Sequence, residues 1–77
     1  MNIQAIFKYN NQNYNNEFSV LEEQIEETID IWIKSIVPQT QLLRATTKDF
    51  NGSMRKVFMY LNENQIITVM VRELING

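Results

Sequence analysis

The sequence predicts an α+β fold in which one amphipathic helix packs on one face of an antiparallel sheet, in the order ββαβββ. Three observations lead to this expectation. Residues 1–9 alternate between apolar and polar side chains, residues 19–37 repeat apolar side chains at helical spacing, and residues 41–75 form three alternating runs separated by short turns. A chain of 77 residues is expected to form a single domain, residues 1–77.

The first hairpin is expected to pair residues 1–9 with a weaker strand at residues 14–18. The odd positions from Ile3 to Tyr9 share one face, as in a half-buried strand. A run of Asn and Gln follows at residues 10–13, and Asn tolerates the backbone conformations of turns. A four-residue turn there sets Tyr9 opposite Tyr14 and Ala5 opposite Phe18.

A helix is expected between Ser19 and Val37. Ser19 and Glu22 have the spacing of a capping box, and Pro38 ends the helix. Apolar residues at helical spacing form one stripe along this helix, made of Leu21, Ile25, Ile29, Trp32, Ile33 and Ile36. Trp32 is interpreted as an anchor of this stripe in the core.

The last three strands are expected to form a meander, because Asn51-Gly52 and Glu63-Asn64 separate three alternating runs. Pairing across these turns sets Lys48 opposite Arg55 and Arg55 opposite Arg72. The face expected to pack beneath the helix carries Leu43, Ala45, Phe58, Tyr60, Ile67, Val69 and Val71. The opposite face is expected to carry Leu42, Arg44, Thr46, Lys48, Arg55, Val57, Met59, Leu61, Ile66, Thr68, Met70 and Arg72.

Composition excludes several classes of chemistry. The chain has no Cys and no His, so disulfides, a thiol nucleophile, an imidazole base and an ordinary zinc site are all absent. No glycine-rich phosphate loop or nucleophile motif occurs, and no apolar run approaches the ~20 residues that span a bilayer. We therefore expect a cytoplasmic, non-enzymatic protein with no cofactor, no metal site and no membrane contact.

The face of the sheet that the helix does not cover is the first candidate binding surface. It combines a row of cations with aliphatic and Met side chains, and apolar patches of this kind often mark interfaces. Like charges directly opposite each other in a sheet are destabilising, so an anionic partner is one interpretation and a solvated edge is the other. The candidate residues on this surface are Arg44, Lys48, Arg55, Val57, Met59, Met70 and Arg72.

The polar side of the helix is the second candidate surface. Residues 1–38 carry two Lys and six acids, for a charge of −4, whereas residues 39–77 carry +2. This side either docks on a basic partner or is a solvated face whose acids lie near the helix N-terminus, where the helix dipole favours them. Its candidate residues are Glu23, Glu26, Glu27, Asp30 and Ile31, with Ile31 outside the apolar stripe and partly exposed.

The leading hypothesis for function is a non-enzymatic module that binds a protein partner. In size and composition the chain is similar to small inhibitors and accessory proteins of phages and mobile elements, a resemblance that transfers no residues. A homodimer is also plausible from size alone, because a core this small contributes only about 3–5 kcal/mol of folding stability and a second subunit would add to it. The alternative is a nucleic-acid-binding module that uses Lys48, Arg55 and Arg72.

A third hypothesis is a small ribonuclease toxin. Such toxins have a similar closing run of β-hairpins and a cluster of basic and Tyr residues, a role open to Arg44, Arg55, Lys56, Tyr60 and Arg72. Against this hypothesis, Lys56 and Tyr60 are expected on the face opposite to the arginines. The two helices that usually open such toxins are also missing.

Overall fold

Five antiparallel strands and one helix make up the computed structural model, which describes residues 1–75 apart from the side chain of Phe50. The elements are β1 (Asn2–Tyr9), β2 (Gln12–Ser19), the 3₁₀ turn η1 (Glu22–Gln24), α1 (Ile25–Ile36), β3 (Thr40–Phe50), β4 (Ser53–Asn62) and β5 (Gln65–Glu73). They form one sheet in the spatial order β2-β1-β5-β4-β3. The predicted ββαβββ order and the antiparallel sheet are confirmed.

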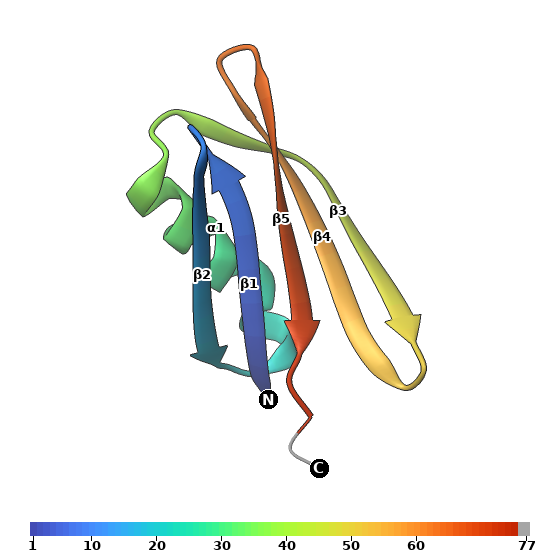
Figure 1. Ribbon diagram of the computed structural model, residues 1–77. Helices are drawn as coiled ribbons and strands as arrows, with labels where there is room; N and C mark the ends of the chain where they lie inside the picture. The colour runs from blue at the N-terminus through green and yellow to red at the C-terminus, as the bar shows by residue number, and fades with distance from the viewer. Residues whose placement is uncertain (76–77) are drawn as a thin grey trace.

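The helix connects the two edge strands of the sheet, because β2 precedes it and β3 follows it. A connection between opposite edges must cross one face of the sheet, and α1 lies on that face, behind β1 and β2 in Figure 1. The hairpin of β3 and β4 extends beyond the helix (Figure 1). The other face of the sheet is therefore left without a covering element among residues 1–75.

The first hairpin turns more tightly than the sequence predicted. Asn10 and Asn11 have φ of 51° and 64°, the left-handed conformation that a two-residue turn of a hairpin requires and that Asn tolerates. As a result Phe7 pairs with Tyr14 and Ile3 with Phe18, so the predicted pairings of Tyr9 with Tyr14 and of Ala5 with Phe18 are wrong. The shift is two residues, which leaves every side chain on its predicted face.

The helix also begins later than predicted. Ser19 is the last residue of β2, and Leu21 precedes η1. The backbone N–H of Leu21 donates to Oε1 of Gln24 at 3.1 Å, so Gln24 takes over the role that the capping box assigned to Glu22. Leu21 is 57% exposed and does not belong to the core stripe. The predicted end of the helix before Pro38 is confirmed.

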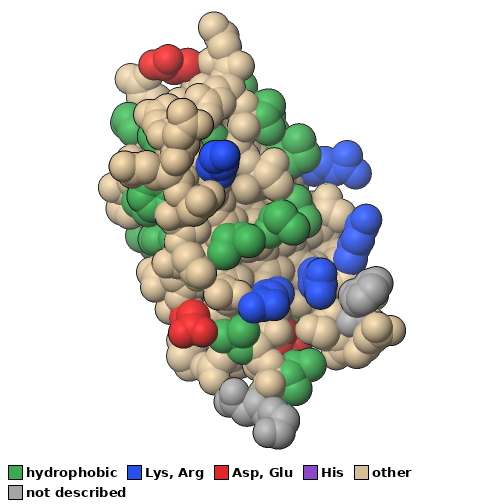
Figure 2. Space-filling model, viewed as in Figure 1, with side chains coloured by type: hydrophobic (Ala, Val, Ile, Leu, Met, Phe, Trp, Pro, Cys, Tyr) green, Lys and Arg blue, Asp and Glu red, His purple; other side chains and the backbone are tan. Residues whose placement is uncertain are grey.

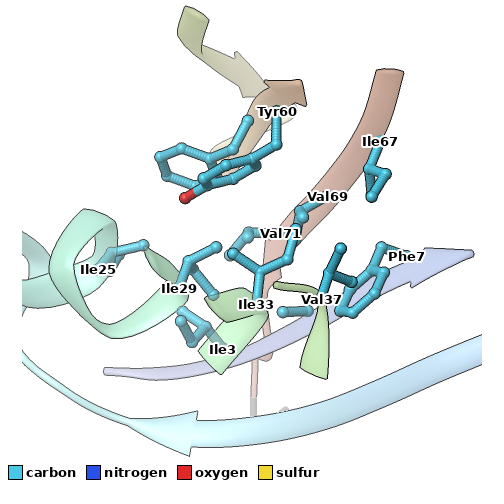
Figure 3. Packing of buried hydrophobic residues seen from close by; sticks show 12 residues of the cluster. Ile3, Phe7, Ile25, Ile29, Ile33, Val37, Tyr60, Ile67, Val69 and Val71 are labelled. Carbon is cyan, nitrogen blue, oxygen red and sulfur yellow. The ribbon is translucent and has the colours of Figure 1, made fainter. Parts of the chain in front are cut away.

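The core lies between α1 and the sheet, as Figure 3 shows. Its buried members come from β1, α1, β4 and β5 and from the residue that follows α1: Ile3, Ala5, Phe7, Ile25, Ile29, Ile33, Val37, Phe58, Tyr60, Ile67, Val69 and Val71. Trp32 packs against this core, with its ring centroid 4.9 Å from that of Phe7 and 5.6 Å from that of Phe18. Edge-to-face ring contacts of this kind add to the stabilisation from buried area.

A β-bulge in β3 corrects the predicted faces of that strand. The register against β4 shifts between Leu42 and Arg44, so one extra residue interrupts the alternation. Leu42 consequently packs against the core, whereas Leu43 is 49% exposed. Ala45 is also exposed on this edge strand. The prediction that Leu43 lies in the core and Leu42 on the opposite face is therefore wrong. Ala45 keeps its predicted pairing with Phe58 and lies on the predicted face, but it is not buried there.

Candidate interaction surface

The face of the sheet opposite α1, here called the open face, is defined by the strand register. Its side chains alternate with buried ones on β1, β5 and β4, and the register extends it to both edges. Figure 2, which views this face, shows apolar side chains at its centre and Lys and Arg side chains beside them. The described side chains that the register places on the open face are Asn2, Gln4, Ile6, Lys8, Asn13, Asn15, Glu17, Ser19, Gln41, Arg44, Thr46, Lys48, Ser53, Arg55, Val57, Met59, Leu61, Ile66, Thr68, Met70 and Arg72. Glu17, which pairs with Gln4, is the one acid among them.

The predicted row of cations is present on the open face. Lys48 pairs with Arg55, and Arg55 pairs with Arg72, on three neighbouring strands. We call Lys48, Arg55 and Arg72 the basic row. Arg44 pairs with Met59 on the same face, and it lies four residues before Lys48 on β3. Directly opposed like charges weaken a sheet, so this row is not explained by the stability of the strands it lies on.

The sheet order brings a second group of polar residues to the end of the basic row. Gln4 of β1 pairs with Arg72, and its Oε1 accepts a hydrogen bond from Nε of Arg72 at 2.7 Å. Nε2 of Gln4 donates to Oδ1 of Asn15 on β2 at 3.2 Å. This chain of hydrogen bonds across three strands orients the guanidinium of Arg72, whose Nη atoms carry further donors.

A row of aliphatic side chains lies beside the basic row. Ile6 pairs with Met70, and Met70 pairs with Val57, so the three follow one line across β1, β5 and β4. Ile6 is 42% exposed and Met70 is 52% exposed. We call Ile6, Met70 and Val57 the apolar row. Together with Gln4, Asn15, Arg55 and Arg72 it lines a shallow pocket of about 460 Å³.

The acidic side of the helix is exposed as predicted. Glu23, Glu26 and Glu27 are exposed, and Ile31 is 64% exposed beside them. Asp30 differs, because its carboxylate accepts a hydrogen bond from Nζ of Lys34 at 2.9 Å in an i,i+4 ion pair. Both predicted surfaces are thus exposed, and they lie on opposite sides of the sheet. They share no side chain.

One buried polar group lies under the acidic side of the helix. Tyr60 is fully buried, and no described residue meets its hydroxyl at full hydrogen-bonding distance and angle, although the Asp30 carboxylate lies close enough to act on it. Figure 3 shows this hydroxyl directed toward α1, near Ile25 and Ile29. Burial raises the pKa of Tyr60 well above its usual range, and the negative charges of Asp30 and Glu26 raise it further. The phenol is therefore neutral at physiological pH.

The basic and Tyr residues of the ribonuclease hypothesis do not meet. Lys56 pairs with Val71 and shares the helix side of the sheet with the buried Tyr60, whereas Arg44, Arg55 and Arg72 lie on the open face. Within residues 1–75, no group of acidic side chains is arranged to hold a metal ion. No helix in this range is long and apolar enough to cross a membrane.

Comparison with protein-family models, with curated proteins and with solved structures finds no match to this chain. The geometry of the surface is therefore the basis for any functional conclusion.

Three open-face residues that line the pocket were not predicted from the sequence: Gln4, Ile6 and Asn15. The alternation of β1 already assigned Gln4 and Ile6 to the side away from the core. The alternation pattern does not predict the strand order, because no short-range sequence signal indicates that β1 pairs with β5. An apolar Ile6 among polar neighbours on the outward side of β1 was the one available signal.

Proposed function

We propose that this protein is a non-enzymatic interaction module that binds a partner protein through the open face. One observation carries the proposal: aliphatic side chains remain about half exposed beside the basic row, on a face that no described element covers. Water contact with Ile6, Ile66 and Met70 is unfavourable for the isolated chain, and a docked partner would remove it. Met and aliphatic side chains adapt to the irregular surface of a protein partner.

A nucleic acid is the alternative partner, and the surface suits it less well. The described side chains of the open face include no aromatic ring on which a base could stack. The net charge is −2, and acids of α1 occupy the opposite side of the molecule. Nucleic-acid-binding domains tend to be basic instead. The basic row supplies three cations, which also suit a carboxylate-rich protein surface.

Site-specific photo-crosslinking in cells tests this proposal. A photoreactive amino acid replaces Met70 on the open face and, in a matched protein, Glu27 on the helix. We expect a covalent adduct with another protein from position 70 and none from position 27. Adding Val57→Glu should remove the adduct, because a carboxylate then faces the partner's acidic surface. Circular dichroism of each variant shows whether the fold is retained.

Two other results contradict the proposal. An adduct only between two copies of this chain identifies self-association as the role of the open face, and light scattering at low and high salt measures the mass of that species. An adduct only from position 27 moves the site to the acidic helix. Titration with labelled RNA and DNA completes the design, since tight binding that weakens steeply with salt supports the nucleic-acid alternative.

A further inference from the structure

Two amide side chains, Gln4 and Asn15, organise the end of the basic row at Arg72. Gln4 accepts the Nε hydrogen bond of Arg72 at 2.7 Å, and Asn15 in turn accepts one from Gln4 at 3.2 Å. An arginine side chain normally has many rotamers, and holding it in one orientation lowers the entropy lost when it binds a ligand. The oriented guanidinium presents N–H donors in the fork geometry that matches a carboxylate.

The apolar row lies at a fixed distance from this guanidinium. Arg72 and Met70 are two residues apart on β5, and Arg55 and Val57 are two residues apart on β4. Two residues of a strand span about 7 Å, which is also the spacing of side chains i and i+2 on one face of an extended peptide. A strand packed face to face on a sheet keeps nearly the same direction as the strands below it.

From this placement we propose that the pocket between β1, β5 and β4 is a binding site for an extended acidic segment of a protein. A carboxylate of that segment binds Arg72, and an aliphatic side chain two residues away packs on Ile6, Met70 and Val57. Arg55 and Lys48 continue the positive surface toward β3 and accommodate further acids. The inference rests on the proposed function and specifies the chemistry of the partner.

A side-chain carboxylate fits this site better than a phosphate of a nucleic acid. The pocket that contains Arg72 and Arg55 also contains Ile6, Val57 and Met70, so a ligand must bring apolar surface close to its negative charge. Acidic residues next to Val, Leu or Ile do so in an extended peptide. A nucleic acid offers base planes instead, and the described open face has no ring to stack on them.

Peptide titration monitored by ¹⁵N-HSQC spectra of the full chain tests this site. The probes are blocked pentapeptides at millimolar concentration: TETVT, its neutral counterpart TQTVT, and TETTV, which has the acid and the aliphatic residue at a different spacing. We expect TETVT to shift amide signals of β1, β4 and β5 around Gln4, Met70 and Arg72. Both controls should bind about tenfold more weakly, because each loses one of the two contacts.

Gln4→Met tests the positioning of Arg72, since it keeps a long side chain and removes the acceptor. It should weaken TETVT several-fold and leave TQTVT unchanged. Gln41→Met is the matched control, because Gln41 pairs with Leu61 far from Arg72. Absence of open-face shifts with TETVT, or equal affinity for TETVT and TQTVT, overturns the inference. Stronger competition by a short RNA than by TETVT also overturns it and identifies phosphate as the ligand.

These outcomes remain distinguishable from failure of the proposed function. If TETVT does not bind while photo-crosslinking from position 70 still captures a partner protein, the open face binds a partner of different chemistry. If crosslinking from position 70 captures no other protein, the proposed function itself fails.

Discussion

The two faces of the sheet differ sharply in how far their side chains are exposed. In the middle of β5 the inward side chains are Ile67, Val69 and Val71, each at most 2% exposed. The outward side chains of the same strand are Ile66, Thr68, Met70 and Arg72, all of them exposed. The backbone is shared, so the difference between the faces comes from what lies against them.

This difference shows which parts of the sequence the fold explains. The inward face alternates as a half-buried sheet should, and α1 covers it. The outward face departs from that rule, because it places aliphatic residues beside opposed cations. Folding alone favours neither feature. Residues on the inward face are thus explained by stability, and those on the outward face are the ones that the proposed partner would cover.

The largest expected effect is a difference between two neighbouring isoleucines of β5. Ile67→Ala removes a fully packed side chain and leaves a cavity, which costs about 2–5 kcal/mol of unfolding free energy. Ile66→Ala changes a side chain that is already 48% exposed and should cost well under about 1 kcal/mol. Urea unfolding followed by Trp32 fluorescence measures both variants. Equal losses would mean that the open face is covered in solution.

An intermediate effect is expected on the inward face at alkaline pH. Burial raises the pKa of Tyr60 above the value of about 10 for an unfolded chain, so above pH 10 the unfolded state releases a proton that the folded state retains. The contribution of Tyr60 to the unfolding free energy is therefore fully present below pH 10. Above pH 10 this contribution falls by about 1.4 kcal/mol per pH unit.

Tyr60→Phe isolates that contribution. The variant lacks the ionisable group, so its unfolding free energy should fall less steeply between pH 10 and 11 than that of the unaltered protein. At pH 7 the two proteins should differ by less than about 1 kcal/mol, because the hydroxyl that is removed is buried and makes at most a poorly aligned contact with the Asp30 carboxylate. Equal alkaline slopes for the two proteins would show that Tyr60 ionises readily in the folded state.

Sequence reasoning predicted the elements of the fold because their signals are local. The Asn51-Gly52 turn fixes the pairing of Lys48 with Arg55, and Pro38 fixes the end of α1. The errors arose where one inserted residue or one turn type changes the register. The bulge between Leu42 and Arg44 has no sequence signature of its own, because Leu42 and Leu43 are equally apolar. Packing against the core decides which of them is buried.

The candidate site was predicted only in part, for a different reason. The basic row follows from two turns, each of which joins strands that are consecutive in the chain. The pairing of Gln4 with Arg72 joins β1 to β5, strands at opposite ends of the chain. Such contacts depend on how the helix folds the first hairpin back onto the meander. The oriented guanidinium of Arg72 could therefore be found only in the structure.

The smallest expected effect concerns the basic row itself. Lys48→Glu replaces a cation opposite Arg55 with an anion, turning an unfavourable cross-strand pair into a favourable one. The unfolding free energy should rise by about 0.2–1 kcal/mol at low salt, and the gain should shrink at high salt as the charges are screened.

Lys48→Gln is the matched control, since it removes the repulsion without adding an attraction and should give about half the gain. Binding is expected to change in the opposite direction, with Lys48→Glu weakening the capture of a partner from position 70. A variant that folds more stably and binds less well would show that the row is maintained for recognition at a cost to the fold. A loss of stability in both variants would mean instead that Lys48 supports the hairpin, and that the basic row is a solvated edge.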